Sequence, residues 1–589
     1  MVKYRKKLVC VWGAFMESKI INLTTAYEEK MDKNTPWSDY PRPSLVRDSF
    51  YCLNGLWDFS VCPVGEAPKY DKKILVPFSP ESALSGYCNE IPAGMLMHYR
   101  RNFSLPWGFA YDRVILHFGA VDTICDVMIN GEVVGHHEGG YLPFSFDITD
   151  FLKTENELCV KVRDDLDKIY PYGKQTRKRG GMWYTPVSGI WQTVWIESVP
   201  KDYVTAIKID SDTSSAKITV LGGAEAKKLT IHETGEVFDF VGDTITVTPK
   251  DIKLWSPESP FLYNFTLKSG EDEVMGYFAL RKIDIQEFYG IPRICLNGEP
   301  YLFNGLLDQG YFPDGLFLPA TSEGFSDDIL MVKRLGFNTL RKHIKVEPEI
   351  FYHLCDKLGV VVFQDMVNNS DYSFFRDTAL PTVGLRGLSD KNLHKNKKSR
   401  EIFERNMRET IDHLNRFPSV LYYTVFNEGW GQFSADEMYE VAKECAPSRI
   451  IDATSGWFVQ KKSDVDSRHV YFKPVKLGKV GKRPIVISEF GGYSHRVEGH
   501  LSSPDNYGYK LYETMDEFEA GFRNLYENEI LPLIPKGISA LIYTQVSDVE
   551  DETNGLVTYD RRVVKVSESY TKKMMEKLSD SIKHTENIK

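Results

Sequence analysis

Two glutamates, Glu428 and Glu489, each follow a short apolar run and precede glycine-containing sequence. Two carboxyl groups about 5 to 5.5 Å apart can hydrolyse a glycosidic bond with retention of configuration, because one attacks the anomeric carbon while the other protonates the leaving oxygen. The alternative for each glutamate is an ion pair at a strand end, which is the usual role of a single carboxylate. Two glutamates in the same setting favour chemistry if the fold brings them together.

The sequence after Gln286 alternates continuous apolar runs with amphipathic segments, which is typical of βα units around a parallel sheet. Eight strands are expected, near Tyr301, Phe337, Val360, Val420, Ile450, Val470, Ile485 and Ile538. Eight such strands close a (β/α)8 TIM barrel, whose active site lies at the C-terminal ends of the strands. Glu428 follows the fourth strand and Glu489 follows the seventh. A catalytic barrel over residues 286–589 would therefore bring both to one mouth.

Local signals within the barrel region predict two helices and a loop. Ser326, followed by two aspartates, predicts the start of a helix that ends at Gly336. Pro348 and Gly359 predict the start and the end of the next helix. The stretch 371–400 is long and rich in Gly, Ser and Lys, so we expect it to form a loop over the mouth.

The sequence before the barrel consists of short alternating runs separated by turn signals, which is typical of antiparallel sheets. Residues 35–200 predict a jelly-roll β-sandwich, in which Asn130-Gly131 forms the tight turn of a hairpin. Residues 201–285 predict a smaller, immunoglobulin-like β-sandwich. Residues 1–34 would form an N-terminal extension. The predicted fold class is thus a multidomain protein with two sandwiches and a TIM barrel.

Composition excludes several classes of partner. The net charge of −10 arises from interspersed residues, which offers no basic patch to nucleic acid or a membrane surface. The nine cysteines form no C-x-x-C pairs, so we expect neither disulfides nor a metal site, and a cytoplasmic location. No segment is long enough to span a bilayer. Basic residues before the apolar run 8–16 leave a short secretion signal as the alternative.

Ordered motifs extend along almost the whole chain after Trp37. The motifs of the first sandwich are Pro41-Arg-Pro43, Leu53-Asn-Gly-Leu-Trp-Asp-Phe59 and Gly180-Gly-Met-Trp-Tyr-Thr-Pro-Val-Ser-Gly-Ile-Trp191. The motifs of the barrel are Leu302-Phe-Asn-Gly305, Leu340-Arg-Lys-His-Ile-Lys345, Phe426-Asn-Glu-Gly-Trp-Gly431, Ile487-Ser-Glu-Phe-Gly491 and Tyr543-Thr-Gln-Val-Ser-Asp548. In this order they resemble glycoside hydrolase family 2, which includes β-galactosidases, β-glucuronidases and β-mannosidases. The resemblance implies a retaining exo-β-glycosidase whose first sandwich is sugar-binding-like.

The resemblance also implies distinct roles for the two glutamates. Glu428 would be the general acid/base, because it follows Asn427 as the acid of the family follows its asparagine, and Glu489 would be the nucleophile. Asn427 would then bind the sugar 2-hydroxyl, where hydrogen bonds strengthen as the transition state forms. The pair is often followed by proline in the family, whereas Gly429 follows it here. This departure concerns the geometry of the loop rather than the chemistry.

Other residues at strand ends are candidates for substrate binding. His343 and Asp365 end the second and third strands, where they could bind sugar hydroxyls or serve equally as satisfied rim residues. Arg341 is a candidate to orient the nucleophile by a bidentate contact, or to form a structural ion pair. Four aromatic residues could either stack on a sugar ring or pack in a core. They are Trp430, Trp457, Tyr471 and Tyr543.

The expected sugar depends on one further motif. β-Glucuronidases of the family carry an asparagine-any-lysine motif after the eighth strand, whereas this chain has Glu552-Thr-Asn554 there, and an acidic residue would repel a uronate. A β-galactosidase is therefore the leading expectation. The alternatives are another family 2 β-glycosidase and a non-catalytic carbohydrate-binding protein. We expect a glycoside or oligosaccharide as the partner, and neither a cofactor nor a metal. The oligomers common in the family make a homo-oligomer an open expectation.

Overall fold

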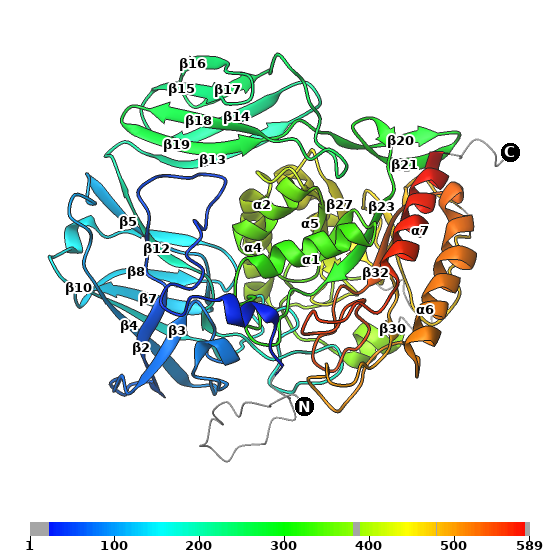
Figure 1. Ribbon diagram of the computed structural model, residues 1–589, viewed down its shortest axis with the longest axis horizontal. Coiled ribbons are helices and arrows are strands. Elements are labelled where there is room, and N and C mark those ends of the chain that lie inside the picture. The colour runs from blue at the N-terminus through cyan, green and yellow to red at the C-terminus, as the bar shows by residue number, and fades with distance from the viewer. Residues whose placement is uncertain (1–22, 381–388, 479, 584–589) are drawn as a thin grey trace.

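The structure is a computed structural model that describes residues 23–380, 389–478 and 480–583. It shows two β-sandwiches beside a barrel (Figure 1), which confirms the predicted fold class. The apolar run 8–16 lies outside the described residues, and so does most of the predicted extension 1–34. No helix among the described residues is long and apolar enough to cross a membrane. The predicted domain limits stay predictions.

The first sandwich packs two antiparallel sheets around one apolar core. One sheet has the order β1-β12-β5-β9, with β1 (Tyr51–Cys52), β5 (Arg113–Phe118), β9 (Phe144–Asp147) and β12 (Val194–Val199). The other has the order β3-β2-β4-β10-β7-β8, with β2 (Gly55–Pro63), β3 (Lys72–Val76), β4 (Met95–Phe103), β7 (Ile124–Ile129), β8 (Glu132–Glu138) and β10 (Asn156–Arg163). A small ribbon joins β6 (Val121–Asp122) to β11 (Gly189–Ile190).

The hairpin predicted at Asn130-Gly131 is confirmed. These two residues join β7 to β8, and their φ angles are +54° and +87°. Both angles lie in the left-handed region that a tight hairpin turn requires, and asparagine and glycine tolerate that region best.

The second sandwich is smaller and encloses its own core. One sheet has the order β13-β14-β17, with β13 (Val204–Ser211), β14 (Ala216–Gly222) and β17 (Thr244–Val247). The other has the order β16-β15-β18-β19, with β15 (Ala226–Ile231), β16 (Val237–Val241), β18 (Tyr263–Ser269) and β19 (Asp272–Phe278). A three-stranded sheet of β20 (Ile283–Phe288), β21 (Ile291–Leu296) and β22 (Glu299–Pro300) follows.

Eight parallel strands form the barrel, and all eight occur where the sequence predicts them. They are β23 (Phe303–Asp308), β24 (Thr339–Lys342), β25 (Val361–Asp365), β26 (Val420–Asn427), β27 (Ile450–Ser455), β28 (Asp466–Val470), β29 (Ile485–Gly491) and β32 (Ile538–Thr544). Most of their residues are buried, because apolar side chains fill both the barrel interior and the space under the helices. A parallel pair, β30 (Tyr493–Ser494) and β31 (Lys510–Leu511), lies outside the barrel.

The barrel sheet has two edges, β27 and β28, which no backbone ladder joins in the described part of the chain. Side chains link these edges instead. Ser455 at the end of β27 lies 2.8 Å from a ring nitrogen of His469 on β28, and Ser467 on β28 donates to Ser455 at 3.4 Å. The seam of the barrel is therefore closed by polar side chains close to its C-terminal mouth.

Helices cover the outside of the barrel (Figure 1). They are α1 (Glu323–Arg334), α2 (Glu349–Leu358), α4 (Lys397–Leu414), α5 (Ala435–Cys445), α6 (Met515–Asn524) and α7 (Glu568–Ser581). The start predicted at Ser326 is wrong, because α1 begins one turn earlier and Ser326 is inside it. The bounds predicted from Pro348 and Gly359 are confirmed. Within the predicted loop 371–400, a helical turn spans Phe375–Ala379, and residues 381–388 lie outside the described residues.

Candidate active site

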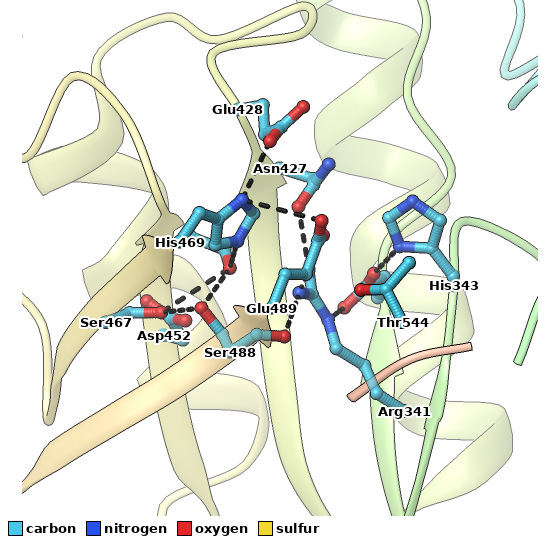
Figure 2. Close-up of polar contacts among 12 residues, drawn as sticks. Arg341, His343, Asn427, Glu428, Asp452, Ser467, His469, Ser488, Glu489 and Thr544 are labelled. Carbon is cyan, nitrogen blue, oxygen red and sulfur yellow. Dashed lines mark hydrogen bonds and ion pairs between the residues drawn. The ribbon is translucent and has the colours of Figure 1, made fainter. Parts of the chain in front are cut away.

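Glu428 and Glu489 meet at the C-terminal mouth of the barrel. Glu489 lies near the end of β29, and Glu428 follows the last residue of β26. One carboxylate oxygen from each glutamate and one ring nitrogen of His469 all lie within 4.8 Å of one another. Figure 2 shows the two carboxylates converging on the same space. This proximity suits the pair of carboxyl groups about 5 to 5.5 Å apart that hydrolysis with retention requires.

Glu489 is held by a cation and a hydroxyl. The Arg341 guanidinium donates to Oε1 of Glu489 at 3.0 Å, and the Tyr471 hydroxyl donates to Oε2. A buried ionised carboxylate is costly unless such partners compensate for the lost water. Both contacts therefore hold the two oxygens of Glu489 in place, as an attacking nucleophile requires.

Arg341 links three sides of the mouth. Its Nε donates to Asp365 at 2.9 Å, and one terminal nitrogen donates to Oδ1 of Asn427 at 2.8 Å. Its contact with Glu489 comes from a single nitrogen, which also donates to the Ser488 carbonyl at 2.9 Å, and is not the bidentate fork considered from sequence. Burial lowers the pKa of Arg341, but Asp365 and Glu489 outweigh burial and raise it. Arg341 is therefore a fixed cation that orients other groups.

Asp365 is used inside the protein. One of its oxygens accepts from Arg341, and the other lies 2.7 Å from Nδ1 of His343. Burial raises the pKa of Asp365, but Arg341 and His343 hold it below its ordinary value. Its side chain does not line the pocket, so its position does not support the predicted direct contact with a sugar hydroxyl. Asp365 instead positions Arg341 and His343.

His343 presents one ring nitrogen to the pocket. Burial, together with the nearby Lys174 ammonium, lowers the pKa of His343 to about 4, although Asp365 opposes both. The imidazole is therefore neutral at neutral pH, and its Nδ1–H donates to Asp365. Its Nε2 is then a hydrogen-bond acceptor, which suits the predicted contact with a sugar hydroxyl.

Glu428 has a different partner, which sequence reasoning missed. Its Oε1 lies 2.8 Å from Nδ1 of His469, and the same nitrogen lies 3.6 Å from Oε2 of Glu489. The backbone of Glu428 has a φ angle of +50°, and its N–H donates to the Ser455 carbonyl at 2.9 Å. A non-glycine residue in this conformation costs of order 1 to 3 kcal/mol, and such strain is concentrated at functional sites.

The two glutamates line a pocket with about 280 Å³ of open space. Ligand pockets begin at about 300 Å³, so this volume suits one sugar ring rather than a long chain. The other lining residues are Lys174, Met182, Leu307, Gln309, His343, Asn427, Trp430, Tyr471, Tyr509, Thr544 and Glu552. The oxygen of Asn427 is engaged by Arg341, so the amide nitrogen is the group that Asn427 offers to a sugar hydroxyl.

Lys174 enters this pocket from the first sandwich. It is 7% exposed, and its ammonium lies 5.5 Å from the ring centre of Tyr184 and 5.7 Å from that of Trp430. Among the described residues it has no hydrogen-bond acceptor or carboxylate within contact distance. Two cation–π contacts compensate only partly for the loss of water around a buried ammonium. Lys174 is thus a cation available to a ligand.

Glu552 brings a carboxyl group to the same pocket. It accepts hydrogen bonds from the Tyr184 hydroxyl and from Nε2 of Gln545, the latter at 3.1 Å. Burial raises the pKa of Glu552, while Lys174 lowers it. Asn554, two residues later, accepts from Gln545 at 2.8 Å and does not line the pocket. The acidic residue noted in the sequence therefore does reach the substrate site.

The four aromatic candidates fall into two groups. Trp430 and Tyr471 line the pocket, where Trp430 stacks on Trp183 and Tyr471 stacks on Tyr509. Trp457 lies 5.7 Å from the His469 ring and does not line the pocket. Tyr543 is also absent from the lining, and it packs in the core.

Two of the missed residues differ in how far the sequence could have revealed them. His469 lies two residues before Tyr471 on the sixth strand, so a search for polar residues at strand ends could have included it. Lys174 carries no such signal, because its place in the pocket depends on the packing of the first sandwich against the barrel. The backbone N–H of Tyr172 donates to the Asn368 carbonyl at 3.0 Å and fixes that packing locally.

A second cavity, of about 540 Å³, lies where the first sandwich meets the barrel. Its buried carboxylate Glu347 accepts from Lys342 and Lys345, each at 2.8 Å, so both cations already neutralise it. Two further carboxylates, Asp39 and Glu349, line this cavity, and Glu349 lies 3.8 Å from the Arg416 guanidinium. The prediction that the chain needs no metal stays a prediction.

Two family models match the chain. The glycosyl hydrolase 2 galactose-binding domain-like model matches residues 94–190, and the glycosyl hydrolases family 2 TIM barrel domain model matches residues 293–578. The two matches cover most of the first sandwich and nearly all of the barrel. They contain every residue of the site described above.

Individual relatives agree with these models. A β-galactosidase of Thermoanaerobacter pseudethanolicus is 30% identical over 296 residues, which are 46% of this chain and 39% of that protein. The chain spans about half the length of the curated relatives it matches.

Solved structures share the fold. A β-D-glucuronidase of Dictyoglomus thermophilum matches with a TM-score of 0.72 at 18% identity, covering 91% of this chain and 98% of that one. A β-galacturonidase of Eisenbergiella tayi matches with a TM-score of 0.65 at 20% identity, covering 90% and 97%. Together with the motifs, the fold and the paired glutamates, these matches show that the chain belongs to glycoside hydrolase family 2.

Proposed function

We propose that the protein is a retaining exo-β-glycosidase that acts by double displacement. The observation that carries this proposal is the pair Glu428 and Glu489, whose carboxylate oxygens lie within 4.8 Å of each other in a pocket sized for one sugar. A retaining enzyme needs its nucleophile and its acid at this short spacing, whereas an inverting enzyme needs room for a water molecule between them.

In the first step, Glu489 attacks the anomeric carbon while Glu428 protonates the departing oxygen. Arg341 and Tyr471 hold the carboxylate of Glu489 in position for this attack. In the second step, Glu428 accepts a proton from water, the water oxygen bonds to the anomeric carbon, and the bond to Glu489 breaks. The Asn427 amide and the His343 Nε2 are placed to bind hydroxyls of the same ring.

β-Galactosides are the first glycone that we propose. The support comes from the sequence, which lacks a lysine near Asn554, and from relatives that carry the name β-galactosidase. The buried Glu552 fits this proposal, because its free oxygen can accept a hydrogen bond from a neutral sugar hydroxyl.

A β-uronide is the second candidate glycone, and Lys174 is the observation that favours it. A sugar carboxylate would supply the acceptor that this buried ammonium lacks among the described residues. Solved relatives named β-glucuronidase and β-galacturonidase share the fold. The lysine would come from the first sandwich instead of the segment near Asn554, so the missing motif does not exclude it.

Turnover of a panel of aryl β-glycosides tests the proposed reaction. We expect release of the aryl group from at least one β-glycoside, and proton NMR should show the β-anomer as the first sugar product. A first product of α configuration would contradict the retaining mechanism. Binding without any turnover would leave only a carbohydrate-binding role.

The variant Lys174→Met separates the two glycones. If a uronide is the substrate, kcat/KM for the aryl uronide should fall about 10- to 100-fold, because a charged hydrogen bond is lost, while the low activity on the galactoside is unchanged. A selective loss on the galactoside would instead mean that Lys174 binds a neutral hydroxyl. The exposed Lys178 provides the matched control, and Lys178→Met should alter neither activity.

A further inference from the structure

His469 is buried between the two catalytic carboxylates. Its Nδ1 lies 2.8 Å from Oε1 of Glu428 and 3.6 Å from Oε2 of Glu489, and Figure 2 shows its ring between the two side chains. No step of the reaction described so far uses this ring. An imidazole ring at this place can carry a proton, and it can also fix the position of the neighbouring carboxylates.

The second nitrogen of His469 faces a group of three serines. Its Nε2 lies 2.8 Å from Oγ of Ser455, which donates to Oγ of Ser488 at 2.9 Å. Ser488 in turn lies 2.6 Å from Oγ of Ser467. Ser467 faces the buried carboxyl of Asp452: burial raises the pKa of that carboxyl, and the Ser467 hydroxyl opposes the rise. The three serine hydroxyls thus form a hydrogen-bonded chain beside His469.

The direction of this chain sets the tautomer of His469. Each serine has one hydroxyl proton, and the Ser455 hydroxyl donates its proton to Oγ of Ser488. The Ser455 proton is then directed to Ser488 and is not available to His469. The 2.8 Å contact must therefore be a donation from Nε2–H of His469 to Ser455.

With Nε2 protonated, one more proton must lie between His469 and Glu428. A bare Nδ1 lone pair facing an ionised carboxylate at 2.8 Å would be repulsive, so the gap contains either the acid proton of Glu428 or a proton on Nδ1. Both arrangements hold the same number of protons. The ring and the carboxyl thus form one unit with a single transferable proton.

Charged groups on neighbouring strands act on this unit from several sides. Glu489 on β29 attracts positive charge to the ring, and Asp452 on β27 does so through the serines. The Arg341 cation on β24 lies beyond Glu489 and offsets part of this attraction. The hydroxyl of Tyr471, on the segment after β28, donates to Glu489.

We propose that His469 is a positioning residue that shares the acid proton of Glu428, and that the Ser455, Ser467 and Ser488 hydroxyls fix its tautomer. This inference rests on the proposed function, since it concerns the proton that the general acid delivers.

The proton balance of the reaction follows from this pairing. In the first step the bond from the anomeric carbon to the aglycone oxygen breaks, that oxygen takes the shared proton, and Glu489 forms the new bond. The unit then lacks its transferable proton, so the Nδ1 lone pair faces ionised Glu428 in an unfavourable contact that makes the unit a good acceptor for a proton from water. In the second step the attacking water returns a proton to the unit, and the electron pair of the breaking bond returns to Glu489. Loss of the Glu489 charge in the intermediate removes one attraction that held a proton on the ring, so Glu428 is free to act as base.

The variant His469→Asn tests the proposal on the aryl glycoside that the wild-type protein hydrolyses best. Its amide can still donate to Glu428 but holds no transferable proton, so the variant should lose its acid proton at lower pH. We expect the basic limb of the kcat/KM profile to move down by about one pH unit. With a phenyl leaving group kcat/KM should fall about 100-fold at neutral pH, and with a dinitrophenyl leaving group it should fall less than about 10-fold, because that group departs without acid help.

Two further variants keep the test decisive. Ser455→Ala removes the acceptor for Nε2–H and should move the same limb in the same direction by a smaller amount. The exposed His136, which contacts Asp126 on the first sandwich, is the matched control, and His136→Asn should leave the profile unchanged. Equal losses on both leaving groups with an unmoved profile would reduce His469 to a structural role and overturn the inference. Failure of the wild-type protein on every glycoside would instead refute the proposed function.

Discussion

The two carboxylates that we propose to be catalytic, those of Glu428 and Glu489, lie within 4.8 Å of each other but have opposite surroundings. Glu489 receives hydrogen bonds from the Arg341 cation and from the Tyr471 hydroxyl, so both of its oxygens are engaged. Glu428 has a single ring partner, His469, and its backbone adopts a left-handed conformation after the strand ends. One carboxylate is bound by a cation and a hydroxyl, while the other contacts an imidazole, a group that can give and take a proton.

This difference suggests how one fold assigns two roles to the same residue type. A permanent cation beside a carboxylate excludes its protonated form, whereas an imidazole permits both forms. The same rule applies elsewhere in the chain, and the predictions below test it at carboxylates with and without a cation.

The largest effect is expected at the residue that the cation holds. Glu489→Gln should lower kcat by at least about 10⁴-fold, because the amide cannot form the glycosyl-enzyme bond. A slowly turned over 2-fluoro glycoside should label the wild-type protein at Glu489, which peptide mass spectrometry can locate. A label on Glu428 would reverse the two roles.

The next effect concerns the carboxylate that has only a ring partner. Glu428→Ala should lower kcat/KM by about 10²- to 10⁴-fold with poor leaving groups and far less with activated ones. Azide should restore turnover by entering the vacated space and should give a β-glycosyl azide, which NMR can identify. Rescue that yields an α-azide would contradict the assignment of Glu489 as the nucleophile.

Removing the Arg341 cation tests whether its contacts with Asp365 and Glu489 also stabilise the fold. Arg341→Met should lower the free energy of unfolding by about 3 to 5 kcal/mol, because Asp365 and Glu489 lose their buried partner. Urea unfolding followed by tryptophan fluorescence would measure this loss. The matched control is Arg100→Met in the partly exposed pair with Asp58, where a loss below about 1 kcal/mol is expected. Equal losses of unfolding free energy in the two variants would show that the buried ion pairs of Arg341 contribute no more stability than a partly exposed pair.

The smallest effect concerns a buried carboxylate that has no bonded cation. Asp356 accepts hydrogen bonds from the Tyr277 hydroxyl and the Ser419 N–H, and burial raises its pKa to about 7. The folded state therefore holds this proton more tightly than the unfolded state. Its stabilising contribution is complete below about pH 4 and is lost as the pH rises to about 7.

The variant Asp356→Asn should remove that pH dependence. The free energy of unfolding of the wild-type protein should fall by roughly 1 kcal/mol per pH unit more steeply than that of the variant between pH 5 and 7. Parallel curves would indicate that Asp356 is ionised in the fold at neutral pH, as Asp365 is beside Arg341.

Much of the fold and of the catalytic pair could be predicted from sequence. The barrel strands have apolar runs of the right length, and Glu428 and Glu489 stand at their ends, where position alone indicates a role. Local turn chemistry gave the hairpin at Asn130-Gly131 and the bounds of α2. The start of α1 was missed because Ser322 and Ser326 offer similar signals one turn apart.

The remaining errors concern contacts that no local pattern encodes. The sequence could place Asp365 at a strand end. It could not show that Arg341 and His343 engage both of its carboxylate oxygens. It also left open whether Tyr543 stacks on a sugar ring or packs in the core, where the structure places it. Lys174 is the clearest case, because a residue far outside the barrel reaches the substrate through packing between two domains.

That contribution has a consequence for how such proteins can be recombined. Lys174 and Met182 belong to the first sandwich, yet they line the pocket whose glutamates belong to the barrel. A chimera that joined this barrel to the sandwich of another relative would keep the paired glutamates and the barrel side of the pocket, including Glu552, but would exchange the two residues that the sandwich contributes. The pocket is thus shared between two segments of one chain, and its sandwich side could diverge while the glutamates are retained.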